Sequence, residues 1–361
     1  MKIVVVGDTL VSSEYMEEQA KRLFPGRNKE IVKFDWEVTT RNEFQKVIFD
    51  LEKNGPQARK LSLDIIKELE TADVFLGHFA PLSEETLYYA KNLKLIGTCR
   101  GGLEHIDVDA ATKRNIPVIH VIRNAEPVAE FTISLILNEC RNIARSHEAI
   151  KKGLWLKTFP NSKFTTVLLE QKVGLLGLGA IGKLVAKKLG NLGVKVIAHD
   201  PYVVKEELEQ VGISIELVSL KELFQEADIV SLHIRLSEKT EKLINMELLS
   251  LMKPNAYLIN TARAGILDED AIIKVLQERK IAGAALDVFW QEPIPTDHPL
   301  LNLENVTLTS HIAGDTIDAI PKAPKLLVNE IIEFLNHEKN DMVVNYNHIK
   351  NTMYKEESLW Y

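Results

Sequence analysis

Residues 172–192 read KVGLLGLGAIGKLVAKKLGNL and combine an apolar run, a glycine-rich turn and an amphipathic segment. The run KVGLL predicts a buried strand, and residues 181–192 predict a helix. Between them, Gly177, Gly179 and Gly182 fit the pattern G-x-G-x-x-G. In such a strand–loop–helix unit the first glycine makes the tight turn, the second lets a pyrophosphate approach, and the third lets helix and strand pack closely. The stretch therefore predicts a site for a dinucleotide.

An acidic residue further along the chain supports this interpretation. Asp200 ends the next strand-like run, eighteen residues after Gly182, where a carboxylate accepts hydrogen bonds from the adenosine ribose. A structural glycine turn with a capping aspartate is the alternative. A triphosphate-binding loop is excluded, because residues 177–183 fit G-x-x-x-x-G-K but Leu184 has no hydroxyl to hold magnesium. Since Asp200 also repels a 2′-phosphate, we expect NADH to be preferred over NADPH.

Strand-like and helical segments alternate through the region that contains the glycine loop. The strand-like runs are residues 172–176, 195–199, 228–233, 256–260, 282–289 and 305–310. The helical segments between them are residues 181–192, 220–225, 246–252 and 268–278. This alternation predicts a parallel sheet with helices on both faces. Six strands are the number of the full Rossmann dinucleotide-binding fold.

The region before the glycine loop has strand-like runs at residues 2–6, 73–77, 93–97 and 116–121. It predicts a small α/β unit of flavodoxin-like type, with residues 38–70 as a helical insertion. Residues 124–153 predict one long helix that ends at Gly153. An amphipathic segment from Ala323 predicts a further helix, which has no strand after it and which we expect to pack back on the first region.

These patterns predict an α/β protein with two doubly wound parallel-sheet domains. We expect residues 1–121 and 315–361 to form a discontinuous, flavodoxin-like substrate domain. Residues 122–314 are expected to form a Rossmann NAD-binding domain. The long helix suits either a spine between the domains or a twofold interface, so we expect a homodimer.

The composition limits the classes of protein and partner. The chain has 361 residues, a net charge of −7 at pH 7 and a pI near 5.9, which argues against nucleic acid or an anionic membrane as a partner. The two cysteines, Cys99 and Cys140, are too few for a disulfide framework or a thiolate metal site. No apolar run approaches the ~18 residues of a membrane span, so we expect a cytoplasmic protein.

Histidine spacing gives no sign of a metal site. The ten histidines include no close pair with ligand spacing, so we expect no metal. Four of them are interpreted as surface or structural side chains: His78, His105, His147 and His298.

Five blocks of the sequence together resemble one family of enzymes. They are RNAEPVAEFTISLIL (123–137), VGLLGLGAIG (173–182), LINTARAGILDEDAI (258–272), AALDVFWQEP (284–293) and TSHIAG (309–314). In this order and at this spacing the chain resembles the D-isomer-specific 2-hydroxyacid dehydrogenases. The resemblance implies an NAD-dependent oxidoreductase that interconverts a small D-2-hydroxy acid and its 2-oxo acid by hydride transfer.

The resemblance also implies a catalytic set of three residues. Arg263 would bind the substrate carboxylate and the adjacent oxygen, while Glu292 would pair with His311, the general acid in reduction and general base in oxidation. These residue types suit the chemistry, because hydride transfer to a 2-oxo acid builds negative charge on the ketone oxygen. Arginine holds a carboxylate with two parallel hydrogen bonds, and histidine exchanges protons near neutral pH. A surface arginine, a capping glutamate and a buried histidine are the structural alternatives.

Further contacts with the cofactor and the substrate follow from the same resemblance. Amides for the pyrophosphate come from Ala180 and Ile181, beside the glycines at 177, 179 and 182. The nicotinamide end is lined by Thr261, Asp287 and Gly314, with Asp287 meeting the carboxamide. The first domain presents backbone amides to the substrate carboxylate at Arg100, Gly101 and Gly102.

Several related functions stay open on the sequence alone. The nearest alternatives are a short-form D-3-phosphoglycerate dehydrogenase and a glyoxylate/hydroxypyruvate reductase, and a remote one is an NAD(H)-sensing, corepressor-like binding protein. A formate dehydrogenase pairs its histidine with glutamine, so Glu292 speaks against that enzyme. Since no regulatory domain follows residue 340, we do not expect the long, amino-acid-inhibited form of phosphoglycerate dehydrogenase.

Two positions depart from the family pattern. The family often has H-x-P after the third strand of its nucleotide-binding domain, where this chain has His233-Ile234-Arg235, so the role of Arg235 stays open between the cofactor loop and solvent. Phosphoglycerate dehydrogenases typically carry an arginine in the loop that here reads GHFAP (77–81). Arg100 is the one residue that could substitute for it. We therefore expect an unphosphorylated substrate.

Overall fold

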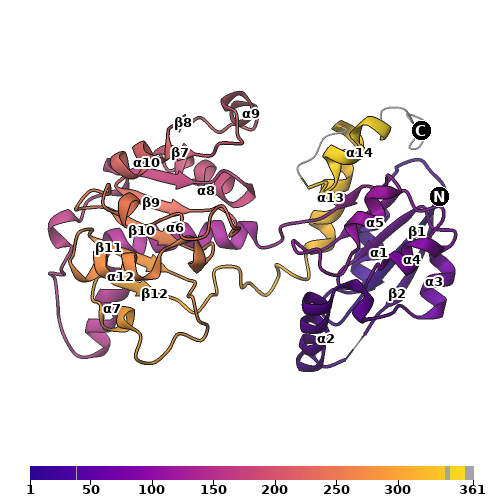
Figure 1. Cartoon of the computed structure of the whole chain (residues 1–361), viewed down its shortest axis with the longest axis horizontal. Helices are drawn as coiled ribbons and strands as arrows, with labels where there is room; N and C mark the ends of the chain where they lie inside the picture. Colours follow the sequence, from indigo (N-terminus) through magenta and orange to yellow (C-terminus); the bar gives the residue numbers. More distant parts are fainter. Residues whose placement is uncertain (38, 338–341, 354–361) are drawn as a thin grey trace. The chain divides into compact units, whose positions relative to one another are not determined.

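The computed structural model describes residues 1–37, 39–337 and 342–353, and the chain divides into two compact units (Figure 1). Unit 1 consists of Met1–Arg123 and Thr316–Tyr361, and unit 2 consists of Asn124–Asp315. Parts of the predicted first domain, residues 38, 338–341 and 354–361, lie outside the described residues. Within the described part of the chain, no helix is long and apolar enough to cross a membrane.

Unit 2 is built on a seven-stranded sheet in which all the neighbouring strands run parallel. Its strands are β6 (Lys172–Leu176), β7 (Lys195–His199), β8 (Glu216–Leu217), β9 (Ile229–Leu232), β10 (Tyr257–Asn260), β11 (Gly283–Leu286) and β12 (Val306–Leu308). The order β12-β11-β10-β9-β6-β7-β8 is doubly wound and confirms the predicted fold class. The sequence pattern missed only β8, which has two residues. Ligands of such sheets bind outside the carboxyl ends of the strands where the order reverses, which here is between β6 and β9.

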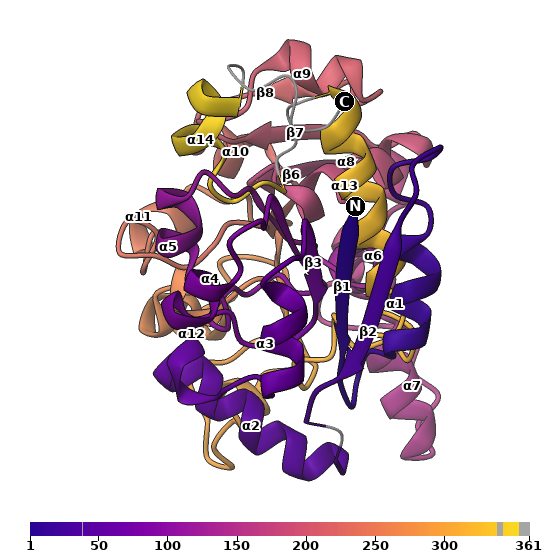
Figure 2. The same cartoon turned by 90° about the vertical axis from the view of Figure 1, so that its right-hand side faces the viewer.

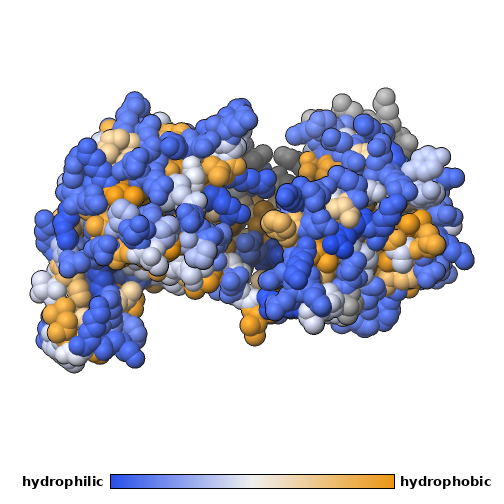
Figure 3. All heavy atoms as spheres, turned by 60° about the horizontal axis from the view of Figure 1, so that its bottom comes forward, coloured by the Kyte–Doolittle hydropathy of each residue, from blue (hydrophilic) through white to orange (hydrophobic). Residues whose placement is uncertain are grey.

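The helices of unit 2 bury both faces of this sheet. Besides two N-terminal helices they are α8 (Ala180–Asn191), α9 (Lys205–Gln210), α10 (Leu220–Glu226), α11 (Met246–Leu249) and α12 (Glu269–Gln277). Successive side chains of a strand point to opposite faces, so Leu258 packs in one apolar cluster and Tyr257 and Ile259 pack in another. With apolar side chains inside, the surface drawn in Figure 3 is mainly hydrophilic, with small separate hydrophobic groups.

The prediction of a single helix over residues 124–153 is wrong, because the structure has two helices there. α6 spans Ala125–Arg141, α7 spans Ile143–Lys151, and Asn142 between them is left-handed with a φ of 56°. Asparagine adopts that conformation more readily than other non-glycine residues. Its Oδ1 accepts a hydrogen bond from Arg145 Nη1 at 3.2 Å, which stabilises the turn.

Unit 1 contains a smaller parallel sheet of the flavodoxin-like order β2-β1-β3-β4-β5. Its strands are β1 (Lys2–Gly7), β2 (Glu30–Asp35), β3 (Val74–Gly77), β4 (Leu95–Thr98) and β5 (Val118–Ile119). Sequence analysis missed β2, an edge strand whose sequence EIVKFD is half charged and none of whose side chains is fully buried. Charged side chains are a common feature of edge strands, and they hide the apolar pattern that marks a central strand.

The helices of unit 1 come from both ends of the chain. They are α1 (Ser13–Ala20), α2 (Arg41–Asn54), α3 (Leu63–Leu69), α4 (Glu84–Tyr89), α5 (Val108–Lys113), α13 (Ala323–His337) and α14 (Tyr346–Met353). Leu327 and Ile331 of α13 lie in the same apolar cluster as Ile3 and Val5 of β1, and Figure 2 shows α13 near β1 and α1. The segment after the glycine-loop unit therefore completes the core of the first region.

The insertion predicted between β2 and β3 is an anchored helix. α2 begins with a capping box, in which Thr40 and Glu43 bond each other's backbone amides. Its apolar stripe consists of Phe44, Val47 and Leu51, which are buried in the same cluster as Val4 and Val6 of β1. This anchoring gives α2 a defined position at the sheet of unit 1.

Candidate active site

The glycine loop of unit 2 meets two different steric requirements. Gly177 has a φ of 98°, and a Cβ there would lie 2.8 Å from the His233 carbonyl oxygen. A Cβ on Gly182 would lie 2.1 Å from the Gly177 carbonyl oxygen. Gly179, in contrast, has no heavy atom within 4 Å of its Cβ position. The protein's own backbone therefore requires the first and third glycines, while the second leaves open the space that a pyrophosphate needs.

The start of α8 and the end of β7 supply the polar groups of this site. α8 begins at Ala180 after Gly179, which caps it without a side-chain hydrogen bond, so the first-turn amides, including that of Ile181, can bind an anion. Asp200, half-buried after β7, accepts hydrogen bonds from the amides of Leu178 at 2.8 Å and Tyr202 at 2.9 Å. These residues fit the pyrophosphate and the adenosine ribose of a dinucleotide.

A tight turn after β10 presents Arg263. Asn260 is fully buried, and its side chain accepts a bond from the Ala262 amide and donates one to the Arg263 carbonyl, both at 3.0 Å. Thr261, also buried, pairs its hydroxyl with Thr132 at 2.8 Å. The Arg263 side chain is exposed, and its Nη1 donates to the Ala262 carbonyl at 2.7 Å. The buried Asn260 side chain thus stabilises the turn, while the Arg263 guanidinium remains at the surface.

A buried carboxylate sets the loop that carries His311. Asp287, which follows β11, is 0% exposed and accepts hydrogen bonds from Thr309 Oγ1 at 2.6 Å and from the amides of Ile312 and Ala313 at 3.0 and 2.9 Å. His311 lies between these anchors with a φ of 56°. Asp287 was predicted to meet the nicotinamide carboxamide, and here both of its oxygens hold the loop after β12.

His311 and Glu292 form a pair at the surface of unit 2. His311 Nδ1 lies 2.8 Å from Glu292 Oε2 and 3.0 Å from Oε1, which also accepts the Phe289 amide at 3.0 Å. Burial alone raises the pKa of Glu292, but hydrogen bonds from His311 and the Phe289 amide, together with the charges of His311 and Arg263, hold that pKa below its usual value. The resemblance to the dehydrogenase family had implied this pairing.

These side chains of unit 2 share one edge of the sheet. Gly177 follows β6, Asp200 follows β7, Arg263 follows β10, Asp287 follows β11 and His311 follows β12. The carboxyl ends of parallel strands lie together, which is where open α/β sheets bind their ligands. Gly314 follows His311 in the loop after β12, and a Cβ there would lie 3.0 Å from Asn124 Nδ2. The edge combines a glycine loop, a guanidinium and an imidazole paired with a carboxylate.

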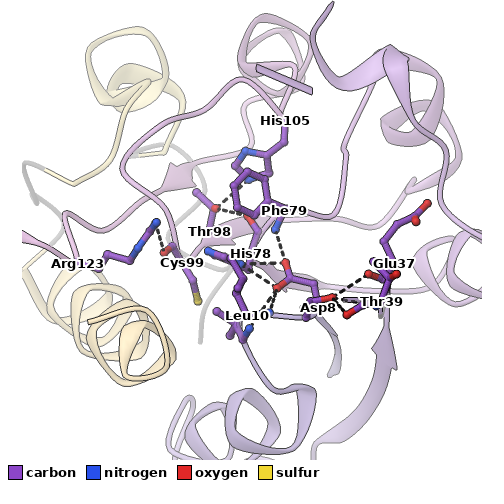
Figure 4. Close-up of polar contacts among 12 residues, drawn as sticks. Asp8, Leu10, Glu37, Thr39, His78, Phe79, Thr98, Cys99, His105 and Arg123 are labelled. Carbon is purple, nitrogen blue, oxygen red and sulfur yellow. Dashed lines mark hydrogen bonds and ion pairs between the residues drawn. The ribbon is translucent and has the colours of Figure 1, made fainter. Parts of the chain in front are cut away.

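The corresponding edge of unit 1 holds a buried polar network that sequence analysis did not find (Figure 4). Asp8, after β1, lies 2.9 Å from His78 Nδ1 and accepts the Phe79 amide at 3.1 Å. Thr98, at the end of β4, pairs with His105 Nε2 at 2.9 Å. Burial lowers the pKa of His78, although Asp8 raises it, and burial also lowers the pKa of His105. The sequence does carry one signal of this network, because a polar residue stands at the carboxyl end of three strands: Asp8 after β1, His78 after β3 and Thr98 in β4.

Backbone groups predicted to meet the substrate lie beside this network. Arg100, Gly101 and Gly102 follow β4, and the Gly101 carbonyl lies 3.0 Å from His120 Nδ1. Gly102 is crowded, because a Cβ there would lie 2.5 Å from Glu104 Oε2. Because the crowding atom is the end of a flexible, partly exposed side chain, a larger residue at position 102 would require Glu104 to move.

Comparison with known proteins identifies the family. The family described as "D-isomer specific 2-hydroxyacid dehydrogenase, NAD binding domain" matches residues 133–313. A glyoxylate reductase of Thermofilum pendens is 39% identical over 305 residues, covering 83% of this chain and 88% of that protein. This chain belongs to the D-isomer specific 2-hydroxyacid dehydrogenase family. It is thus an NAD-dependent oxidoreductase of 2-hydroxy acids.

Other relatives of this dehydrogenase differ in length and in name. A D-3-phosphoglycerate dehydrogenase of Methanocaldococcus jannaschii is 37% identical over 78% of this chain, but the match covers only 53% of that protein. The NAD-complexed crystal structure of a D-isomer specific 2-hydroxyacid dehydrogenase from Lactobacillus delbrueckii is similar with a TM-score of 0.68 at 25% identity. That similarity covers 95% of this chain and 100% of the other. The long enzymes thus share only part of their length with this dehydrogenase.

The predicted residues of the dehydrogenase fall into two groups. The structure brings the glycine loop, Asp200, Arg263 and the pair of Glu292 and His311 to one edge of unit 2. The three substrate-loop residues, at positions 100 to 102, lie in unit 1. Sequence motifs located all of these residues, whereas the network around Asp8 depends on contacts distant in sequence.

Proposed function

We propose that this dehydrogenase reduces a small, unphosphorylated 2-oxo acid to the D-2-hydroxy acid, with Arg263 binding the substrate and His311 providing the proton. The observation that carries the proposal is the surface pair of His311 and Glu292, with Arg263 close enough to lower the pKa of Glu292. A cation and a proton donor at one sheet edge are what a developing alkoxide requires.

The pairing of His311 assigns the proton to one nitrogen. Its Nδ1 is engaged by the Glu292 carboxylate, so Nε2 is the nitrogen that gives a proton to the ketone oxygen in reduction and removes it in oxidation. Glu292 fixes the orientation of the ring. Bound NADH supplies the hydride. Arg263 holds the substrate carboxylate through two parallel hydrogen bonds, which orients the 2-oxo group.

The remaining predicted contacts complete the proposal. We assign the pyrophosphate to the glycine loop with the amides of Ala180 and Ile181, and the adenosine ribose to Asp200. Thr261, Asp287 and Gly314 are assigned to the nicotinamide end. For Asp287 this role stands beside its support of the His311 loop. The amides at Gly101 and Gly102 are assigned to the substrate carboxylate.

Two observations support an unphosphorylated substrate. The loop of unit 1 at residues 77–81 has no arginine, and the nearby Arg100 is already paired with Glu52 at 2.9 Å. A hydroxypyruvate reductase of Thermotoga maritima is 37% identical over 75% of this chain, and its named substrate is a small unphosphorylated 2-oxo acid. Glyoxylate or hydroxypyruvate reduction is therefore the favoured activity, and phosphoglycerate oxidation is the second candidate.

The location and assembly of the enzyme are part of the proposal. We infer a cytoplasmic homodimer, since Cys99 and Cys140 are free and buried. α7 and the residues that follow it carry exposed apolar side chains suited to a second copy: Ile143, Ile150, Leu154, Trp155 and Leu156. Light scattering coupled to gel filtration checks the oligomer, and a monomer at all concentrations contradicts it.

The test of the function is oxidation of NADH by the purified protein with a panel of 2-oxo acids. We expect turnover with glyoxylate or hydroxypyruvate, and loss of that turnover in His311→Gln with an unchanged Tm. His298→Gln is the matched control, because His298 also pairs with a glutamate, Glu269, which has no role in the proposed chemistry. Absence of turnover with every 2-oxo acid would favour the alternative of a dinucleotide-sensing binding protein.

A further inference from the structure

The side chain of Arg100 is a buried cation that the proposed mechanism does not use. Arg100 is 7% exposed, and its guanidinium lies over the Phe79 ring with Cζ 3.7 Å from the ring centroid. Its Nε and Nη1 are buried and have no hydrogen-bond partner among the described residues. Buried charges are normally fully paired. Nη2 is thus the nitrogen through which this guanidinium meets an anion.

That anion is supplied by two glutamates of the same unit. Glu52 Oε1 lies 2.9 Å from Arg100 Nη2, and Glu104 Oε2 lies 3.5 Å from it. Each glutamate side chain is 44% exposed, whereas the arginine side chain is 8% exposed. The cation is therefore fixed in the protein, and its anionic partners lie on the solvent side.

The shorter contact comes from the inserted helix α2. Glu52 lies in the last turn of α2, where the helix dipole disfavours a negative charge. The helix itself is held by Phe44, Val47 and Leu51 and by the capping box at its other end. α2 does not depend on Glu52 for its position, so the pairing with Arg100 is the contact that explains a carboxylate at this place.

The guanidinium also lies against the loop assigned to the substrate carboxylate. A Cβ on Gly102 would be 3.1 Å from Arg100 Nη2. A substrate held by the Gly101 and Gly102 amides would therefore lie within a few bond lengths of this cation. A second anionic group on a short 2-oxo acid is the chemical group that a guanidinium recognises there.

We propose that Glu52 is a specificity-determining residue, which occupies Arg100 and thereby excludes 2-oxo acids with an anionic far end. This inference rests on the proposed function. A second carboxylate or a phosphate must displace a tethered carboxylate of high effective concentration. It must also approach Glu104, whose like charge repels it. Without Glu52, Arg100 becomes the binding site for that anion.

The test compares substrates that differ at the far end only. The two pairs are hydroxypyruvate with 3-phosphohydroxypyruvate, and pyruvate with oxaloacetate. For each pair we divide the kcat/KM of the substrate with the second anionic group by the kcat/KM of the substrate without it. In Glu52→Gln we expect this ratio to rise about tenfold, equal to about 1.4 kcal/mol. Asp50→Asn is the matched control on the same helix, because Asp50 accepts from Arg59 and Asn54 instead. Its ratio stays at the wild-type value.

Two further variants make the outcome specific. Adding Glu104→Gln to Glu52→Gln raises the ratio further, and adding Arg100→Met instead abolishes the gain. A ratio that stays within threefold of wild type in Glu52→Gln overturns the inference and makes the ion pair purely structural. An equal rise in kcat/KM for substrates with and without the second anionic group also overturns the inference, because Arg100 then acts on the carboxylate that both substrates share.

A binding measurement separates this inference from the proposed function. We expect 3-phosphoglycerate to raise the Tm of Glu52→Gln more than that of the wild type, while glycerate raises both alike. This readout needs no turnover. If the wild type reduces no 2-oxo acid, the proposed function is wrong, and the Tm comparison still decides the role of Glu52. Equal shifts with 3-phosphoglycerate in both proteins contradict the inference.

Discussion

Both units carry charged side chains at the carboxyl edge of a parallel sheet, but they treat these charges differently. In unit 2, the paired side chains of His311 and Glu292 are 46% and 40% exposed, and Arg263 is exposed beside them. In unit 1, the paired His78 and Asp8 are 0% and 1% exposed. One edge leaves its polar groups exposed, while the other buries them and pairs only some of their atoms: His78 Nε2 and His105 Nδ1 have no hydrogen-bond partner among the described residues.

The difference follows from the cost of burying charge. Removal of one partner from a buried hydrogen bond is costly, because the polar group left behind is desolvated and unsatisfied. Asp8 therefore fixes two loops of unit 1: the loop after β1, through the Leu10 and Val11 amides, and the loop after β3, through His78 and the Phe79 amide. Exposed groups hold no such structural role and remain available for chemistry. The comparison predicts large functional and small structural effects at the edge of unit 2.

Removal of the Arg263 guanidinium is expected to have the largest effect. Arg263→Ala loses two charge-assisted hydrogen bonds of about 1.5–3 kcal/mol each, so kcat/KM should fall about 1000-fold. Arg263→Lys keeps the charge without the fork and should fall less. Steady-state kinetics with the best 2-oxo acid measures both. Arg279→Ala, which removes an exposed arginine paired with Glu304, serves as the control. Near-wild-type kinetics in Arg263→Ala would make it an ordinary surface residue.

Asp287 is the exception at this edge, because it is buried and positions the His311 loop. Asp287→Asn places an amide where the carboxylate accepts three hydrogen bonds. We expect kcat to fall about 100-fold, since general acid catalysis contributes roughly 10²–10⁴, with a smaller change in KM. Asp268→Ala is the control, as it removes the N-cap of α12 in the same unit. If the two variants lose Tm and kcat in parallel, Asp287 has only a structural role.

The preference for NADH over NADPH tests the assignment of Asp200 to the adenosine ribose. Asp200 offers its carboxylate to the ribose, and a hydrogen bond to a charged group contributes roughly 1.5–3 kcal/mol, so the wild type should prefer NADH by about tenfold or more. Asp200→Asn should bring the kcat/KM values for NADH and NADPH close together. Equal use of both cofactors by the wild type contradicts the assignment of Asp200.

The smallest effect is expected for Glu292→Gln. The glutamine keeps an acceptor for His311 Nδ1 but removes the carboxylate that fixes the ring. An exposed pair contributes about 0.2–1 kcal/mol, so kcat/KM should fall by about two- to fivefold. Steady-state kinetics with the best 2-oxo acid measures it, and an unchanged kcat/KM excludes Glu292 as the partner.

The edge of unit 2 was predictable because short motifs encode it. The glycine loop, the turn of Asn260 and Arg263, and the block around His311 are each short stretches of sequence. Spacing located the glycine loop, and the family resemblance located Arg263 and His311. The pairing of Glu292 with His311 spans nineteen residues and required the family resemblance. The double winding of the sheet followed from the alternation of strands and helices.

The edge of unit 1 was not predictable in the same way. Asp8 and His78 are 70 residues apart and Arg100 and Glu52 are 48 apart, so no local pattern signals either contact. β2 was missed because its charged edge sequence lacks a continuous apolar run. The break at Asn142 was missed because apolar spacing continues through it, and the left-handed turn depends on a single residue.

The discontinuity of unit 1 has a consequence for how the chain emerges from the ribosome. Unit 2 is one continuous segment, whereas β1 packs against Leu327 and Ile331 of α13, which is synthesised after the whole of unit 2. At a synthesis rate of about 5–20 residues per second, α13 follows β1 after tens of seconds. During that interval the nascent first region exposes Ile3 and Val5. The order of synthesis thus makes the nucleotide-binding unit the first to mature and gives chaperones a defined hydrophobic surface to protect.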